Sequence, residues 1–201
     1  MRMAKVRKLL ALAAGLNTII FVGEMLGGAE GHSTSLIMDG VHNFSDELAL
    51  VCLFLAYLLP VTMSRNFQRL ANVLNSIGLI SISVFLIWQS VNNIIHPVPT
   101  IGYIPLIAGL LAAIANWGVA RILYSIKDRN AAIRLTYIHI VGDVYVSLAP
   151  VVAGLLVLLT GKYIFDPIIA ILVGVWLIWA TIKEIAHSHD ELIWPEHVAD
   201  Q

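Results

Sequence analysis

Residues 36–55 read LIMDGVHNFSDELALVCLFL, an apolar run that also carries three acidic residues and a histidine. A transmembrane helix needs about 20 predominantly apolar residues to cross a hydrocarbon core about 30 Å thick. An ionisable side chain at that depth costs about 2.5–3.5 kcal/mol on insertion scales, so each one needs a reason to be there. This segment therefore predicts a membrane-spanning helix with a polar site inside the bilayer.

The composition of the whole chain agrees with this interpretation. Of 201 residues, 59% are hydrophobic and only 12% are charged, whereas a soluble domain carries about 25% charged residues. This excludes a water-soluble enzyme, because so few charges cannot cover a globular surface. The net charge of −1 provides no basic field, so we expect no nucleic-acid partner. The single cysteine, Cys52, excludes an intramolecular disulfide and a CxxC motif.

The chain divides into six apolar stretches, so we expect an all-α membrane protein with six transmembrane helices. The first stretch is interpreted as a span rather than a signal peptide, because it carries Asn17 and Glu24 and no clear cleavage site follows it. Pro150 lies inside the fifth stretch and predicts a kink there. The expected spans are 9–27, 36–59, 70–95, 104–124, 133–159 and 164–185.

The basic residues predict the orientation of these spans. Of the 12 lysines and arginines, only Lys162 falls outside one set of loops and termini. By the positive-inside rule both termini should be cytoplasmic, which also fits an even number of spans. We therefore expect residues 1–186 to form the transmembrane domain and residues 187–201 a short cytoplasmic polar tail.

The second and fifth spans each contain a histidine and an aspartate four residues apart, namely His42 with Asp46 and His139 with Asp143. Residues at i and i+4 share one helical face, one turn apart. No lysine or arginine lies at comparable depth in the sequence, so protons or a bound cation must balance the carboxylates. Together the two faces would offer two nitrogens and two oxygens, a tetrahedral set that suits Zn²⁺.

Three other acidic residues at membrane depth are candidates for supporting roles. Asp39 precedes His42 by three residues on the same face, where it would extend the site or orient the imidazole. Glu24 would either help metal or proton entry or bond to a neighbouring helix. Glu47 points about 100° away from Asp46, which favours interhelical bonding or a protonated state over metal ligation.

Further polar and aromatic residues have simpler interpretations. Asn17 and Asn116 are expected to form interhelical hydrogen bonds, and Trp176 to face lipid or the membrane interface. The tail after the last span is either a solvated polar segment or a weak metal-collecting site, with the candidates His187, His189 and His197.

At these residues the sequence resembles the transmembrane domain of the cation diffusion facilitator (CDF) family, which exchanges divalent metal for protons. The stretch 35–46, SLIMDGVHNFSD, looks like the motif of the family's second span, and 137–143, YIHIVGD, like that of its fifth span. The His-x-x-x-Asp pattern in both spans resembles the zinc-transporting branch. The resemblance covers residues 9–185.

The resemblance implies a secondary transporter rather than an enzyme, with no cofactor. It would export Zn²⁺, and also Cd²⁺, from the cytoplasm in exchange for protons by alternating access, with Co²⁺ and Ni²⁺ as alternative substrates. It also implies a homodimer in the lipid bilayer of a bacterial inner membrane. The family usually carries a cytoplasmic C-terminal metal-binding domain, and we expect it to be lacking because the chain ends soon after Lys183.

Other classes would use the same histidines and aspartates differently. A membrane-embedded metalloenzyme would need an open coordination position, which four protein ligands around a tetrahedral metal do not leave. A b-type haem protein would use His42 and His139 as axial ligands. In a proton channel or a purely structural bundle, no metal would move. Metal transport is the interpretation that the two matched pairs favour.

Overall fold

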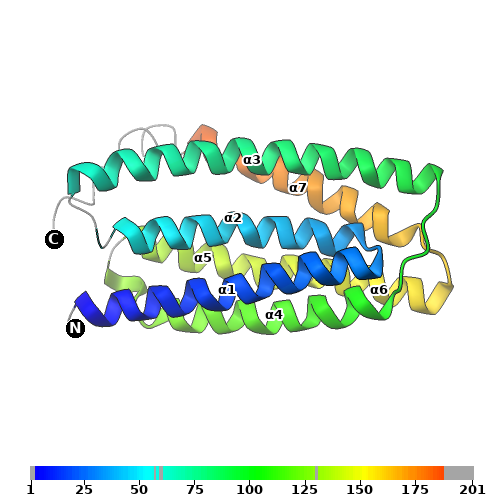
Figure 1. Cartoon of the computed structure of the whole chain (residues 1–201), viewed down its shortest axis with the longest axis horizontal. Helices are drawn as coiled ribbons and strands as arrows, with labels where there is room; N and C mark the ends of the chain where they lie inside the picture. Colours follow the sequence, from blue (N-terminus) through cyan, green and yellow to red (C-terminus); the bar gives the residue numbers. More distant parts are fainter. Residues whose placement is uncertain (1–2, 57, 59–60, 130, 188–201) are drawn as a thin grey trace.

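The computed structural model describes residues 3–56, 58, 61–129 and 131–187, and every regular element in these residues is a helix (Figure 1). The elements follow one another along the chain as α1 (Met3–Gly31), α2 (Thr34–Ala56), α3 (Val61–Ile95), α4 (Tyr103–Tyr124), the 3₁₀ turn η1 (Lys127–Arg129), α5 (Ala131–Val146), α6 (Leu148–Thr160) and α7 (Phe165–His187).

These helices make six crossings of an elongated bundle, with α5 and α6 sharing one crossing. The beginning of α1 and the end of α7 lie toward the same end of the bundle, and the connection from α6 to α7 lies at the opposite end (Figure 1). The predicted all-α fold with six crossings is therefore confirmed.

The fifth crossing is divided at Ser147, three residues before Pro150. Proline has no backbone N–H, and its ring clashes with the carbonyl four residues earlier, so a helix cannot run through it unchanged. The new helix α6 begins at Leu148, which places Pro150 in its first turn, where an N–H is not needed. At the expected kink the structure has a one-residue interruption at Ser147, whose backbone keeps right-handed helical angles and whose N–H still bonds to the carbonyl of Asp143 (2.9 Å).

Within the part of the chain that the structure describes, five helical stretches are long and apolar enough to cross a membrane: Lys5–Gly31, Ser76–Ile95, Tyr103–Tyr124, Thr136–Thr160 and Phe165–Lys183. The helix α2 is not among them, because its polar residues lower its hydropathy. Two helices also begin well before their apolar stretches, α1 at Met3 and α3 at Val61, so the helical backbone continues into polar sequence.

The helix α2 is central, since it contributes to both hydrophobic clusters of the bundle. Its Leu50 packs with Leu10 of α1, Val119 of α4 and Ile140 of α5, all fully buried. Its Met38 belongs to a second cluster, which joins α2 to residues of α3 and α7. Polar side chains on α2 are therefore enclosed by protein from several sides.

Asp166, in the first turn of α7, caps the N-terminus of α2 through hydrogen bonds. Its carboxylate accepts hydrogen bonds from the Ser33 hydroxyl (2.6 Å), the Ser35 hydroxyl (2.5 Å) and the backbone N–H of Thr34 (2.7 Å). A carboxylate at a helix N-terminus pairs with N–H groups that have no partner within the helix. This contact joins α2 and α7 at the end of the bundle opposite the N-terminus of α1.

The helices α4 and α6 cross closely at Gly154, near the beginning of α4. A Cβ atom at Gly154 would collide with the carbonyl oxygen of Gly102 and lie 2.7 Å from the backbone nitrogen of Leu106. Only glycine allows the two backbones to approach this closely.

Candidate metal site

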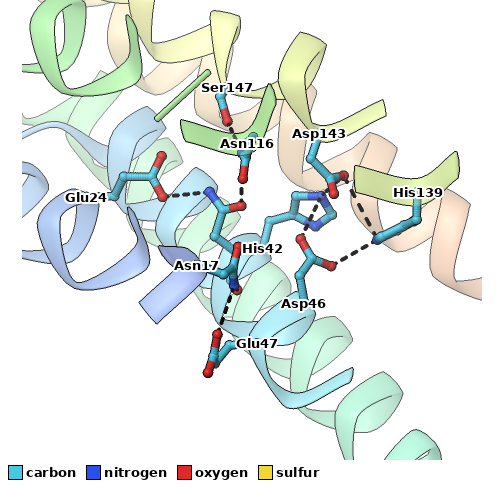
Figure 2. Close-up of polar contacts among 10 residues, drawn as sticks. Asn17, Glu24, His42, Asp46, Glu47, Asn116, His139, Asp143 and Ser147 are labelled. Atoms are coloured by element: carbon cyan, nitrogen blue, oxygen red, sulfur yellow. Dashed lines mark hydrogen bonds and ion pairs between the residues drawn. The ribbon is translucent and has the colours of Figure 1, made fainter. Parts of the chain in front are cut away.

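Two helices present the His–Asp pairs toward each other in the interior of the bundle. His42 and Asp46 lie one turn apart on α2, and His139 and Asp143 lie one turn apart on α5, which packs against α2. Figure 2 shows the four side chains converging. One ligand atom from each residue can be chosen so that all four lie within 4.8 Å of one another.

The shortest contacts run between the helices rather than along them. His42 Nε2 lies 2.8 Å from Asp143 Oδ1, and His139 Nε2 lies 2.9 Å from Asp46 Oδ1. Within each helix the distances are longer, 3.8 Å from His42 Nε2 to Asp46 Oδ2 and 3.9 Å from His139 Nε2 to Asp143 Oδ1. Each histidine thus bonds to the aspartate of the other pair.

These distances suit a tetrahedral metal. Bonds of about 2 Å to zinc place the ligand atoms about 3.3 Å apart. The two contacts between the helices are shorter than this value and the two within the helices are longer, and one ligand atom from each residue lies within 4.8 Å of the others. The arrangement is therefore close to the geometry that the sequence predicts for Zn²⁺.

The four side chains differ sharply in exposure. Those of His42, Asp46 and Asp143 are 3%, 4% and 2% exposed, whereas that of His139 is 49% exposed. Three of the four proposed ligands are therefore enclosed by protein, and His139 is half-exposed on the surface of the bundle.

Several polar atoms of the site have no hydrogen-bond partner among the described residues, namely Asp46 Oδ2, Asp143 Oδ2 and His42 Nδ1. A buried acceptor without a donor is costly, and a buried carboxylate more so. Neither α2 nor the part of α5 that follows Arg134 carries a lysine or arginine that could neutralise the two carboxylates. A cation bound among the four side chains would neutralise the two carboxylates, whereas His42 Nδ1 lies on the side of the ring away from His42 Nε2, which faces the site.

A chain of buried polar residues runs from the site to α1 and α4. Asn43 Nδ2 donates a hydrogen bond to Glu24 Oε2 (2.7 Å), and Asn116 Nδ2 donates both to Asn43 Oδ1 (3.2 Å) and to Ser147 Oγ (3.0 Å). We call Glu24, Asn43, Asn116 and Ser147 the polar relay. Sequence reasoning did not single out Asn43 or Ser147, although their polarity within apolar spans was a signal.

Glu47 bonds to the neighbouring helix α1, as the sequence favoured. Its Oε1 accepts a hydrogen bond from the Thr18 hydroxyl (2.9 Å), and its Oε2 accepts one from Asn17 Nδ2 (3.3 Å). Asn17 also donates to the backbone carbonyl of Asn43 (2.8 Å). The expected interhelical bonding of Asn17 and Asn116 is confirmed.

The other sequence candidates lie outside this constellation. Asp39 is fully buried one turn before His42, and neither of its carboxylate oxygens has a hydrogen-bond partner within the described part of the chain. His187 is the last residue of α7, and His189 and His197 lie outside the described residues.

Trp176 of α7 is a further neighbour of the site. Its ring meets the His42 ring edge-on, with 6.4 Å between the centroids, and its side chain is partly exposed. The sequence indicated only a lipid-facing or interfacial role for Trp176, because packing between α2 and α7 leaves no local signal.

Comparisons with known proteins agree with this geometry. Residues 10–193 match the cation efflux transmembrane domain. The zinc transporter ZitB of Escherichia coli is 28% identical over 195 residues, covering 92% of this chain and 62% of the relative. ZitB of Pectobacterium atrosepticum is 30% identical over 193 residues, covering 88% of this chain and 59% of the relative. The cadmium, cobalt and zinc/H(+)-K(+) antiporter of Bacillus subtilis is 27% identical over 181 residues, covering 84% and 58%.

The chain therefore belongs to the cation efflux transmembrane domain family. It is a multi-pass integral membrane protein, and the relatives that it matches are named as zinc, cadmium and cobalt transporters. The chain spans about 60% of the length of these curated relatives.

Proposed function

We propose that the chain transports Zn²⁺ out of the cytoplasm in exchange for protons, by alternating access, with His42, Asp46, His139 and Asp143 as the ligands. Cd²⁺ is the expected second substrate, and Co²⁺ and Ni²⁺ are further candidates, because they accept the same donor set. The transporter would act as a homodimer in a bacterial inner membrane with both termini in the cytoplasm.

The observation that carries this proposal is the negative charge of the four side chains that converge between α2 and α5. Two buried carboxylates and two neutral imidazoles carry a charge of −2 in a region without basic residues. One Zn²⁺ or two protons would neutralise this charge equally well. Because metal ligation requires deprotonated ligands, zinc and protons compete for the same lone pairs. Loading one Zn²⁺ while releasing two protons would leave the charge of the site unchanged.

The contrast between three buried ligands and the half-exposed His139 supports alternating access. A carrier must expose its site to one compartment at a time, and three of the four ligand side chains are enclosed by protein. The one-residue interruption at Ser147 lies four residues after Asp143 and supplies a joint at which α5 could tilt relative to α6. The close α4–α6 crossing at Gly154 would remain fixed during this movement.

The direct test is zinc uptake into proteoliposomes that contain a zinc dye, with and without a pH gradient. Wild-type protein should take up zinc, with the rate rising as the gradient favours proton counterflow. His42→Ala should abolish uptake, and Glu30→Gln, an exposed site on α1, should leave it unchanged. Undiminished gradient-dependent uptake by His42→Ala would refute the ligand assignment. Proton flux without zinc movement would identify a proton channel instead.

A further inference from the structure

Glu24 and Asp39 form a second buried polar group, which lies between α1 and α2. Their side chains interact directly, and the residues are 2% and 0% exposed. Gly40 permits this approach, since a Cβ atom there would lie only 3.2 Å from the Cβ of Glu24. We call Glu24 and Asp39 the carboxyl pair. It is separate from the four proposed metal ligands.

The hydrogen bonding of the carboxyl pair is incomplete. Glu24 Oε2 accepts a bond from Asn43, but Glu24 Oε1 and both oxygens of Asp39 have no partner within 3.5 Å among the residues described; the Ser147 hydroxyl is a nearby donor that interacts with Asp39. Two ionised carboxylates are both acceptors only and cannot bond to each other, whereas one shared proton turns one of them into a donor. A proton is thus the smallest cation that would satisfy the pair.

The neighbouring groups do not supply a positive countercharge. The ionisable groups that interact with the pair are Asp46 and His42 on α2 and Asp143 on α5, two of which are acids. The neighbour from α4 is the neutral Asn116, which is fully buried and leaves its own Oδ1 without a hydrogen-bond partner in the described part of the chain. The charged residue of α4, Arg121, is exposed five residues beyond Asn116, and α6 carries no charged residue.

The carboxyl pair lies beside the proposed metal site and interacts electrostatically with three of its four residues. Glu24 bonds to Asn43, the residue that follows His42, and the polar relay continues through Asn116 to Ser147 on the α5 side. Asp39 interacts electrostatically with His42 and Asp143, and Glu24 with Asp46. A charge of +2 added among these ligands would favour loss of a proton from the pair.

We propose that Glu24 and Asp39 hold one shared proton and that zinc binding at the neighbouring site releases it to solvent. The charge of the pair then changes from −1 to −2 as the metal site gains +2. This proton is additional to those displaced from the ligands themselves. The inference rests on the proposed zinc binding, but it concerns residues that do not touch the metal.

Calorimetry of the full chain in detergent micelles tests this inference. Zinc chloride is titrated in buffers of different ionisation enthalpy, which gives the number of protons released per zinc bound. In Glu24→Gln the amide donates permanently to Asp39, so the pair keeps its charge of −1 but has no proton to lose. We expect this variant to release about one proton fewer per zinc than the wild type.

The pH profile provides a readout that a purely structural role would not produce. Glu24→Gln should bind zinc as tightly as the wild type at low pH, where the wild-type pair keeps its proton. It should bind more weakly than the wild type at high pH, where the wild-type pair can lose its proton. Asp39→Asn also replaces one carboxyl group of the pair by an amide, so its zinc affinity should have the same pH dependence as that of Glu24→Gln. The zinc affinity of Glu30→Gln should match that of the wild type at every pH.

The possible failures are distinguishable. If the wild type binds no zinc, the proposed function fails. If the wild type binds zinc and both amide variants release the same number of protons as it does, the shared proton is refuted. Loss of zinc binding at every pH in both folded variants would also refute it, because the pair would then be required for the metal site itself. If Glu24→Gln does not fold, the proton count of Asp39→Asn decides.

Discussion

His42 on α2 pairs with Asp143 on α5, at 2.8 Å, more closely than with Asp46 one turn along its own helix, at 3.8 Å. The contact closes the candidate site across two helices, and both side chains are almost fully buried. Removing one partner would leave the other without its hydrogen bond. The four proposed ligands should therefore differ in how strongly they affect folding.

His139→Ala should remove zinc binding with little loss of stability, because the His139 side chain is 49% exposed. His42→Ala should lose zinc binding and also about 1–3 kcal/mol of stability, since it leaves the buried Asp143 carboxylate without its partner. Zinc titration and thermal unfolding in the presence of a chelator measure the two effects separately. The ligand assignment is wrong if His139→Ala binds zinc like the wild type.

Zinc affinity should fall as the pH falls. Protons and zinc compete for the imidazole nitrogens, and an imidazole in its ordinary state titrates near pH 6.5. The dissociation constant for zinc should therefore rise continuously as the pH falls from 8 to 5.5. Fluorescence titration with a zinc-competing dye from pH 8 to pH 5.5 measures this, with dye-only titrations as the control. A constant affinity over this range would exclude the histidines as ligands.

Asp166→Asn should destabilise the protein by about 2 kcal/mol or more, because an amide nitrogen would replace an oxygen that accepts hydrogen bonds from the Ser33–Ser35 segment. Asp128→Asn, on the exposed η1 turn, is the matched control and should have little effect. Thermal unfolding followed by circular dichroism compares the two. Equal melting temperatures would show that the contact between α7 and the beginning of α2 contributes no stability.

Gly154→Ala should impair folding, since its Cβ would collide with backbone atoms of Gly102 and Leu106. Gly15→Ala places the same methyl group on α1, where no atom lies within 4 Å, and should gain about 0.5–1 kcal/mol from higher helix propensity. The two variants should thus shift the melting temperature in opposite directions. A stable Gly154→Ala protein would mean that α4 and α6 can separate at low cost.

Local spacing explains which features the sequence could predict. The i, i+4 positions of each His–Asp pair share a helical face whatever the tertiary structure, and Pro150 disfavours an uninterrupted helix through its position. The crosswise pairing of His42 with Asp143 depends on how α2 and α5 pack, and no periodicity encodes that. For the same reason the Asn43–Asn116 bond, the Trp176–His42 contact and the enclosure of Asp166 required the three-dimensional arrangement.

The polar character of α2 also has a consequence for how the protein enters its membrane. Its acids Asp39, Asp46 and Glu47 would each cost about 2.5–3.5 kcal/mol on an insertion scale if the helix met lipid alone. In the folded protein, α1 supplies partners to this helix, through Asn17 and Thr18 to Glu47 and Asn43. Among these three acids only Glu47 receives hydrogen bonds from α1, so pairing with α1 lowers the insertion cost of Glu47, whereas Asp46 finds its hydrogen-bond partner on α5, which follows later in the chain.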